Sequence, residues 1–210
     1  EQCRKCKINK LIYASSSSVY GSNDKMPFSE KDNVDKPQSI YAASKKSNEL
    51  MASSYSYLFG LNSTGLRFFS VYGPWGRPDM AIYIFTERIL KGKPITIFNK
   101  GCMYRDFTYI DDIVEGTMSS LKKNYRCEIF NLGNGHPESI LEIIRLIENV
   151  TGKKAKIYFE KMRLGDVEKT YADLSHSGTM LNYKTAIRIS EGVPNFISWY
   201  NNYMKSKNGS

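Results

Sequence analysis

The chain has 210 residues, of which 41% are hydrophobic and 13% aromatic, and its formal net charge is +9. This is enough apolar material for a buried core, which excludes a disordered or low-complexity chain. No apolar run approaches the ~20 residues of a membrane span, and the basic residues are spread along the chain, so neither a membrane nor a nucleic-acid partner is expected.

The predicted elements alternate between strands and helices along the chain. We expect strands over residues 7–14, 62–69, 94–98, 128–132 and 155–159, and helices over residues 39–59, 79–90, 111–121, 139–150 and 191–204. The first helix begins at Ser39, a residue type that caps helix N-termini, and Gly60 ends it. Such alternation predicts an α/β fold with a mostly parallel sheet.

A serine-rich turn and a Tyr-x-x-x-Lys pair are the chemical signals of the chain. The turn, residues 15–18, follows the first strand, and Tyr41 and Lys45 lie one turn apart on the next helix. Tyrosine, with an ordinary pKa near ~10, is a weak base at neutral pH, but a lysine on the same helix face favours the phenolate. The pair alone is a weak signal, because Tyr203 and Lys207 repeat it.

A dinucleotide-binding motif is missing from the printed sequence. Such a site needs Gly-x-Gly-x-x-Gly after a strand, whereas Gly133 and Gly135 form the only close pair of glycines and no third follows in register. We therefore expect a fragment that lacks the cofactor-binding half of its enzyme and that is poorly folded and inactive alone.

Several motifs in one order resemble the extended short-chain dehydrogenase/reductase family. Within it the chain is most similar to the NAD-dependent nucleotide-sugar epimerases, above all those that act on UDP-glucuronate at C4. The matching segments are residues 13–21 (Tyr-Ala-Ser-Ser-Ser-Ser-Val-Tyr-Gly), 41–45, 66–81 (with Gly-Pro-Trp-Gly-Arg-Pro-Asp-Met), 104–112, 130–133 and 165–173. The resemblance implies a Rossmann-type doubly wound parallel sheet, of which this chain is the C-terminal part, with a smaller α/β substrate-binding domain.

The resemblance also implies a role for each matching residue. Tyr41 would be the base at the sugar O4, Lys45 would assist it and hold the nicotinamide ribose, and Ser16 would aid proton transfer. The implied substrate contacts are Ser17, Ser18 and Ser70 on the uronate carboxylate, Arg105 and Arg163 on the diphosphate, Asp166 on a ribose hydroxyl, and Arg77 as a further candidate. The implied reaction oxidises C4 with NAD, rotates the 4-keto sugar and returns the hydride to its other face.

One residue, at position 18, separates 4-epimerisation from the other reactions that the resemblance allows. Related decarboxylases and 4,6-dehydratases carry an acidic residue immediately before Val-Tyr-Gly, where this chain has Ser18, so the sequence favours simple 4-epimerisation. An epimerase of a neutral UDP-sugar is an alternative, and so is a non-catalytic remnant that only binds sugar nucleotides.

The resemblance further implies an arrangement of domains and partners. We expect residues 1–75 to belong to the Rossmann-type domain and residues 76–210 mainly to the substrate-binding domain, with the chain crossing back to the sheet around residues 105–135. A homodimer is implied for the intact enzyme, and its product would feed capsule, lipopolysaccharide or cell-wall polymers. Four cysteines give no disulfide framework, which favours a reducing, cytoplasmic setting, and no metal site is expected.

Overall fold

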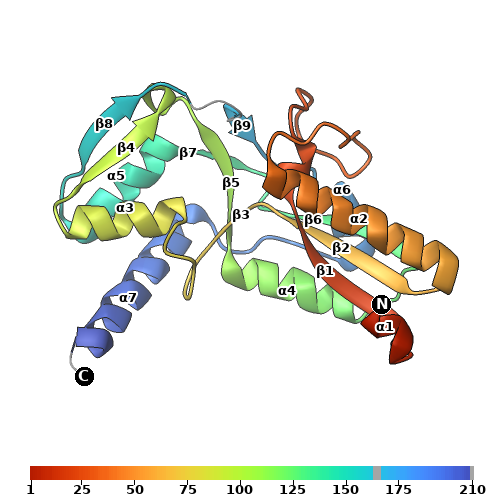
Figure 1. Ribbon diagram of the computed structural model, residues 1–210. Helices are drawn as coiled ribbons and strands as arrows, with labels where there is room; N and C mark the ends of the chain where they lie inside the picture. Colours follow the sequence, from red (N-terminus) through yellow and green to blue (C-terminus); the bar gives the residue numbers. More distant parts are fainter. Residues whose placement is uncertain (163–166, 209–210) are drawn as a thin grey trace.

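The fold is α/β, as predicted. The computed structural model describes residues 1–162 and 167–208. Two groups of elements are joined by a strand that runs between them (Figure 1). Among the described residues, no helix is both long and apolar enough to cross a membrane.

A parallel sheet of three strands forms the first group. Its order is β1 (Lys10–Ser16), β2 (Asn62–Phe68) and β6 (Cys127–Leu132). Helices α2 (Ile40–Phe59) and α4 (Ile110–Leu121) cover its two faces (Figure 1). In β2, Leu66 packs in a cluster with Ile113 of α4, whereas Arg67 contacts Glu49 of α2. Adjacent residues thus serve opposite faces, as the pleat of a strand requires.

Local signals fix both ends of α2. The Ser39 hydroxyl accepts a hydrogen bond from the Ala42 N–H at 3.0 Å, which satisfies one of the free donors of the first turn. At the other end Gly60 adopts φ +68°, in the left-handed region that glycine enters at little cost, and its N–H bonds the Ser56 carbonyl.

A second sheet crosses between the two groups. Strand β5 (Tyr104–Tyr109) pairs in parallel with β3 (Ser70–Tyr72) and β9 (Lys169–Thr170), and antiparallel with β7 (Pro137–Ser139). Because β3 follows β2 closely and α4 follows β5 directly, this sheet links the two groups of elements.

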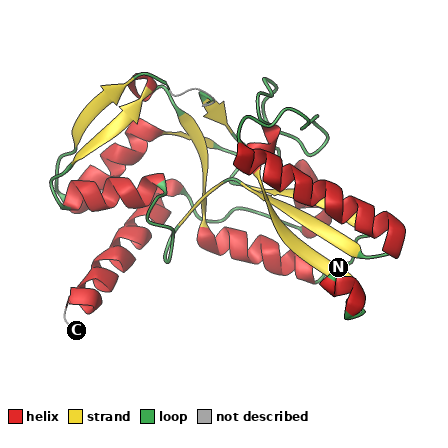
Figure 2. Cartoon of the chain, viewed as in Figure 1, coloured by secondary structure: helices red, strands yellow, loops and turns green. Residues whose placement is uncertain are grey.

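The second group contains most of the apolar core. Helices α3 (Ala81–Leu90), α5 (Ile140–Thr151) and α7 (Ile189–Asn208) lie beside the parallel pair β4 (Pro94–Phe98) and β8 (Lys156–Glu160) (Figure 2). Helix α5 buries isoleucines at i, i+3, i+4 and i+7, the spacing of one helix face. These residues are Ile140, Ile143, Ile144 and Ile147.

Three short helices and a 3-10 turn complete the described chain. They are α1 (Gln2–Lys5), α6 (Ser175–Leu181), the 3-10 helix η1 (Ser17–Tyr20) and the 3-10 turn η2 (Asn99–Gly101). The prediction found every long helix and five strands (β1, β2, β4, β6 and β8) with small shifts of the ends. The first strand, for example, starts at Lys10 rather than Lys7. The prediction missed β3, β5, β7, β9 and α6.

Candidate active site

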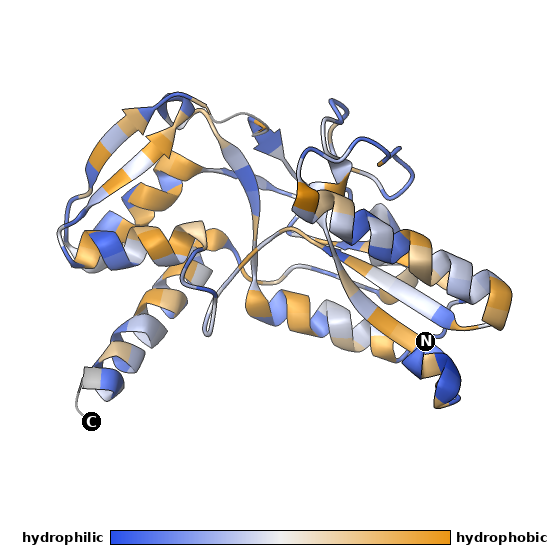
Figure 3. Cartoon of the chain, viewed as in Figure 1, coloured by the Kyte–Doolittle hydropathy of each residue, from blue (hydrophilic) through white to orange (hydrophobic). Residues whose placement is uncertain are grey.

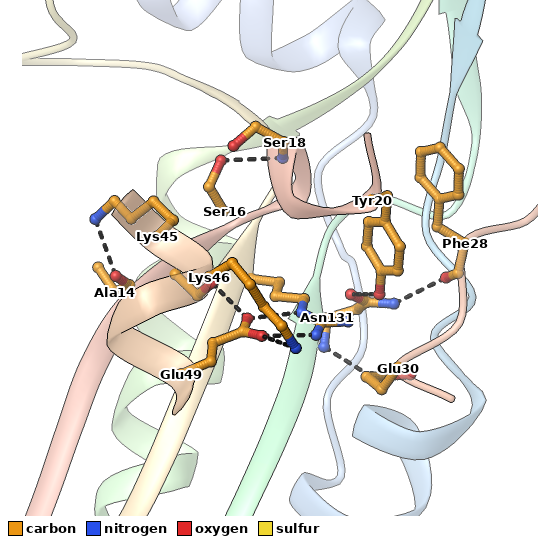
Figure 4. Close-up of polar contacts among 12 residues, drawn as sticks. Ala14, Ser16, Ser18, Tyr20, Phe28, Glu30, Lys45, Lys46, Glu49 and Asn131 are labelled. Atoms are coloured by element: carbon orange, nitrogen blue, oxygen red, sulfur yellow. Dashed lines mark hydrogen bonds and ion pairs between the residues drawn. The ribbon is translucent and has the colours of Figure 1, made fainter. Parts of the chain in front are cut away.

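The serine-rich turn is the last part of β1 together with η1. Ser16 ends the strand, and its hydroxyl accepts a hydrogen bond from the Ser18 N–H at 3.2 Å (Figure 4). Gly21, at φ +58°, ends η1, and a Cβ there would lie 2.1 Å from the Lys36 carbonyl oxygen. The Ser16–Ser18 hydrogen bond thus fixes the start of the serine-rich segment, and the close approach of Gly21 to Lys36 fixes its end. Ser17 and Ser18 are the first two residues of η1.

A cavity of about 240 Å³ joins residues that are far apart in the sequence. Its lining includes Ser16, Ser17 and Ser18 from the turn, Ser70 from β3 and Arg105 from β5. The Ser18 hydroxyl is buried and has no hydrogen-bond partner among the described residues. An unpaired buried hydroxyl is costly, so a polar ligand in this cavity would satisfy it.

Sequence reasoning missed several residues that line the same cavity. Gln38 and Ser39 precede α2 and could have been found, because the start of that helix was predicted next to Tyr41. Phe28 reaches the cavity from a long loop and carried no such signal. The remaining lining residues are Gly21, Val167 and Thr170.

Backbone carbonyl groups hold the Arg105 side chain. Its Nη1 donates to the carbonyl oxygens of Tyr104 at 2.9 Å and Glu168 at 3.1 Å. These bonds fix the guanidinium beside the segment that enters β9.

Tyr41 and Lys45 occupy the first turns of α2, as predicted. The Lys45 Nζ lies 5.8 Å from the centroid of the Tyr41 ring and donates a hydrogen bond to the Ala14 carbonyl oxygen at 2.9 Å (Figure 4). Tyr41 is 54% exposed, so its phenol is open to a substrate. The two residues do not line the serine cavity itself.

Arg77 lies on the Tyr41 side of the site. It forms an exposed bidentate ion pair with Asp79, with Nε–Oδ1 and Nη2–Oδ2 distances of 3.0 and 2.6 Å. The hydrogen bonds and charge of Asp79 raise the pKa of Arg77. The predicted residues Arg163 and Asp166 lie outside the described residues.

A buried charged pair that the sequence analysis did not single out lies beneath α2. Arg67 of β2 donates to both carboxylate oxygens of Glu49, and both side chains are 2% exposed. Burial alone would raise the pKa of Glu49, but the bonds and charge of Arg67 outweigh it and hold that pKa below its ordinary value. Ser15 donates a further hydrogen bond to Glu49 at 2.6 Å.

A second buried carboxylate organises the strand that carries Arg105. Asp106 is fully buried and accepts hydrogen bonds from the Thr108 hydroxyl and from the backbone N–H groups of Asn134, Gly135 and Ala172. Burial raises the pKa of Asp106 although these N–H groups act in the opposite direction. The carboxylate therefore ties β5 to the turn after β6 and to the segment after β9.

Comparison with known proteins decides the family. A family model described as "NAD dependent epimerase/dehydratase family" matches residues 1–133. An uncharacterized protein of Methanocaldococcus jannaschii is 54% identical over 95% of this chain. The chain belongs to the NAD dependent epimerase/dehydratase family. UDP-glucuronate 4-epimerase 5 of Arabidopsis thaliana, a curated relative, is 46% identical over 90% of the chain.

Solved structures share the fold of this family member. The Bacillus cereus UDP-glucuronic acid 4-epimerase in complex with UDP-glucuronic acid and NAD superposes with a TM-score of 0.90 over 96% of the chain, at 38% identity. The chain spans 61% of the Methanocaldococcus relative, 48% of the Arabidopsis relative and 64% of the Bacillus structure.

Proposed function

We propose that this chain supplies the acid–base and sugar-nucleotide-binding parts of an NAD-dependent UDP-glucuronate 4-epimerase. The observation that carries the proposal is the cavity where Ser16, Ser17, Ser18 and Ser70 meet Arg105. The buried Ser18 hydroxyl has no partner in the part of the chain that the structure describes. The serine hydroxyl groups suit a carboxylate, because each can donate a hydrogen bond to an anionic oxygen, and the Arg105 guanidinium at the same cavity suits the diphosphate.

The residues around Tyr41 and Lys45 fit a nicotinamide cofactor. Both side chains lie at the start of α2, the Lys45 ammonium faces the tyrosine ring, and the phenol is more than half exposed. We propose that Lys45 holds a ribose hydroxyl of NAD there. When bound, NAD would accept the hydrogen at C4 of the sugar as hydride and return it, so that none is consumed.

Proton transfer falls to Tyr41 and Ser16. We propose that the Tyr41 oxygen takes the proton of the sugar 4-hydroxyl, and that the Ser16 hydroxyl hydrogen-bonds the same sugar oxygen. The Lys45 Nζ lies 5.8 Å from the centroid of the Tyr41 ring, beside the proposed base. Arg77, which forms an exposed ion pair with Asp79, is a further candidate group for the substrate.

Ser18 favours epimerisation over decarboxylation. A serine hydroxyl can donate a hydrogen bond to a carboxylate, but it is a poor acid at neutral pH and does not supply the proton that an acidic residue would. Arg105 of the cavity and Arg163, with Asp166 on a ribose hydroxyl, are proposed to bind the UDP part. The alternative is a neutral UDP-sugar: the similar protein MoeE5, 32% identical, has been solved with UDP-glucose and NAD.

The arrangement around the site is also part of the proposal. Residues 1–75 would form the remainder of the Rossmann-type domain, and residues 76–210 mainly the substrate-binding domain. A homodimer is supported by the exposed apolar residues of α2, among them Ile40 and Leu58. Figure 3 shows hydrophobic segments along this helix. The four free cysteines fit the reducing setting that the sequence predicts.

Product analysis tests the proposed function. The intact gene product, with any residues encoded upstream of Glu1, is incubated with NAD and, in separate reactions, with UDP-glucuronate or UDP-glucose, and the sugars are identified by NMR. UDP-galacturonate without net NADH is the expected result. A UDP-pentose with carbon dioxide would mean decarboxylation, and conversion of UDP-glucose alone would favour the neutral-sugar alternative.

A further inference from the structure

We propose that the buried Arg67–Glu49 ion pair is a positioning device for the site. It would fix the positions of the proton-transfer groups Tyr41 and Ser16 relative to the cavity that Ser18 lines. This inference rests on the proposed function, because it assigns the pair a role relative to those groups.

The geometry of the pair is well defined. The Arg67 Nε and Nη2 atoms lie 2.8 and 2.9 Å from the two carboxylate oxygens of Glu49, and both side chains are almost completely buried. Burying two charges costs desolvation energy that their attraction roughly repays, so such pairs add little net stability over apolar residues. Because net stability does not explain the Arg67–Glu49 pair, we assign it a role in positioning the elements that it connects.

On one side the pair connects α2 with β1. Glu49 lies one helical turn beyond Lys45. Its carboxylate accepts a hydrogen bond at 2.6 Å from the hydroxyl of Ser15, the residue before Ser16. One turn earlier, Lys45 donates to the Ala14 carbonyl oxygen at 2.9 Å. Two bonds at successive turns fix how far α2 can slide along β1. They therefore set the position of Tyr41 relative to Ser16.

On its other side the pair supports η1. The Arg67 guanidinium carbon lies 4.8 Å from the centroid of the Tyr20 ring, which stacks on Phe28 at 4.5 Å. Tyr20 ends the turn that carries Ser18, and its hydroxyl donates to the Asn131 side chain at 2.7 Å. Figure 4 shows the Tyr20–Asn131 hydrogen bond and the place of Glu49 and Phe28 around it. The same arginine thus supports the helix of the base and the turn of the cavity.

The test uses variants that differ in how much of the network they remove. Ser15→Ala deletes one hydrogen bond and leaves the ion pair intact, and Glu49→Gln removes the charge. The double variant Glu49→Leu with Arg67→Met removes both charges, so it is expected to fold even where the single charge variant does not. Ser56→Ala is the matched control, because the Ser56 hydroxyl anchors the far end of the same helix to the Arg126 carbonyl at 2.7 Å.

Two readouts are taken on the intact gene product. The first is the split between kcat and KM for UDP-glucuronate. The second is the ¹⁹F NMR signal of residue 41 in protein labelled with 3-fluorotyrosine, assigned with Tyr41→Phe. The second needs no turnover, so a failure of the proposed function, seen as an inactive wild type, is distinguishable from a failure of this inference.

A positioning role predicts a specific pattern. In the Ser15 and Glu49 variants and the double variant, kcat falls about 10- to 100-fold with little change in KM, the size expected for a small misplacement of reacting groups. The residue 41 signal moves or broadens in the same variants, and Ser56→Ala changes neither readout. Folded Ser15→Ala and double variants with the wild-type kcat and the wild-type signal would overturn the proposal.

Discussion

Ser18 is the residue on which the proposed choice of substrate depends. Ser18 lines the cavity that Arg105 reaches from β5, and its hydroxyl is buried without a hydrogen-bond partner among the described residues. A carboxylate placed there would accept the hydrogen bond that the protein leaves unmade. A neutral hydroxymethyl group could accept it too, but without the strength that a charge adds.

Removing the Ser18 hydroxyl should therefore lower kcat/KM more for the acidic substrate than for a neutral one. For Ser18→Ala we predict a loss of about 1.5–3 kcal/mol, roughly 10- to 100-fold, in kcat/KM for UDP-glucuronate, the value of a hydrogen bond to a charged group. The loss for UDP-glucose should be smaller. Steady-state kinetics with both sugars measure the effect, and Ser54→Ala, an exposed serine of α2, is the control. Equal losses for the two sugars would argue against a carboxylate contact.

Tyr41 is proposed to be the base, and the chain contains its own control. Removing the phenol oxygen with Tyr41→Phe should lower kcat about 10²- to 10⁴-fold, because proton transfer to a positioned side chain is lost while the ring and its packing stay. In α7 the Lys207 Nζ lies 6.0 Å from the Tyr203 ring, nearly the geometry of the Lys45–Tyr41 pair. Tyr203→Phe should leave kcat unchanged. If both variants lose activity alike, the loss comes from folding.

At the scale of elements, the ends of α2 were predictable because single residues determine them. Ser39 and Gly60 are cap types, and the helix between them was found to within one residue at each end. Strand β5 was missed because Arg105 and Asp106 interrupt an apolar pattern. Asp106 is nonetheless buried, since its partners come from residues 134, 135 and 172, which a local pattern does not contain.

Candidate residues were predicted more completely than the contacts that hold them. Ser16, Ser17, Ser18, Ser70 and Arg105 line one cavity, and the roles that the resemblance implies for them stay predictions. The Arg67–Glu49 pair was not singled out, because two isolated charged residues in a strand and a helix carry no signal of mutual burial until the sheet and helix are packed together.

Gly60 allows a clean test of the end of α2. No other atom lies within 4 Å of a Cβ built there, so the cost of Gly60→Ala comes from the φ of +68° alone, and we predict a loss of about 1–2 kcal/mol. Gly178, inside α6, has no positive φ and an open contact of 3.7 Å, so Gly178→Ala should stabilise by about 0.5–1 kcal/mol. Denaturant unfolding measures both. Shifts of the same sign would contradict this explanation.

The buried carboxylate beneath α2 predicts a dependence of stability on pH. Arg67 holds the folded-state pKa of Glu49 below its ordinary value of 4.5 despite burial. The stabilisation is therefore complete above the unfolded pKa near 4.5 and is lost as the pH falls through the lower folded value. Urea unfolding of wild type and Glu49→Gln between neutral and acidic pH measures this. The difference between the two proteins should shrink as the pH falls, and a difference that is constant with pH would refute the linkage.

At the scale of the whole molecule, the two groups of elements are joined where the proposed site lies. The serine turn and α2 come from the group around the three-stranded sheet, whereas Arg105 comes from the strand that crosses between the groups. This division suits an enzyme that holds the sugar at one set of elements and its nucleotide at another. The chain spans 61% of its Methanocaldococcus relative, so turnover is best examined with the intact gene product.

The most direct test of the central claim follows the hydrogen atom on C4. UDP-glucuronate carrying deuterium at C4 is incubated with the intact gene product and NAD, and the product is examined by NMR and mass spectrometry. We predict UDP-galacturonate that retains deuterium at C4, because only the hydroxyl proton is exchanged through Tyr41 while the carbon-bound hydrogen is removed and returned. Replacement of the deuterium by solvent hydrogen, or a product without the carboxylate, would contradict the proposed 4-epimerase.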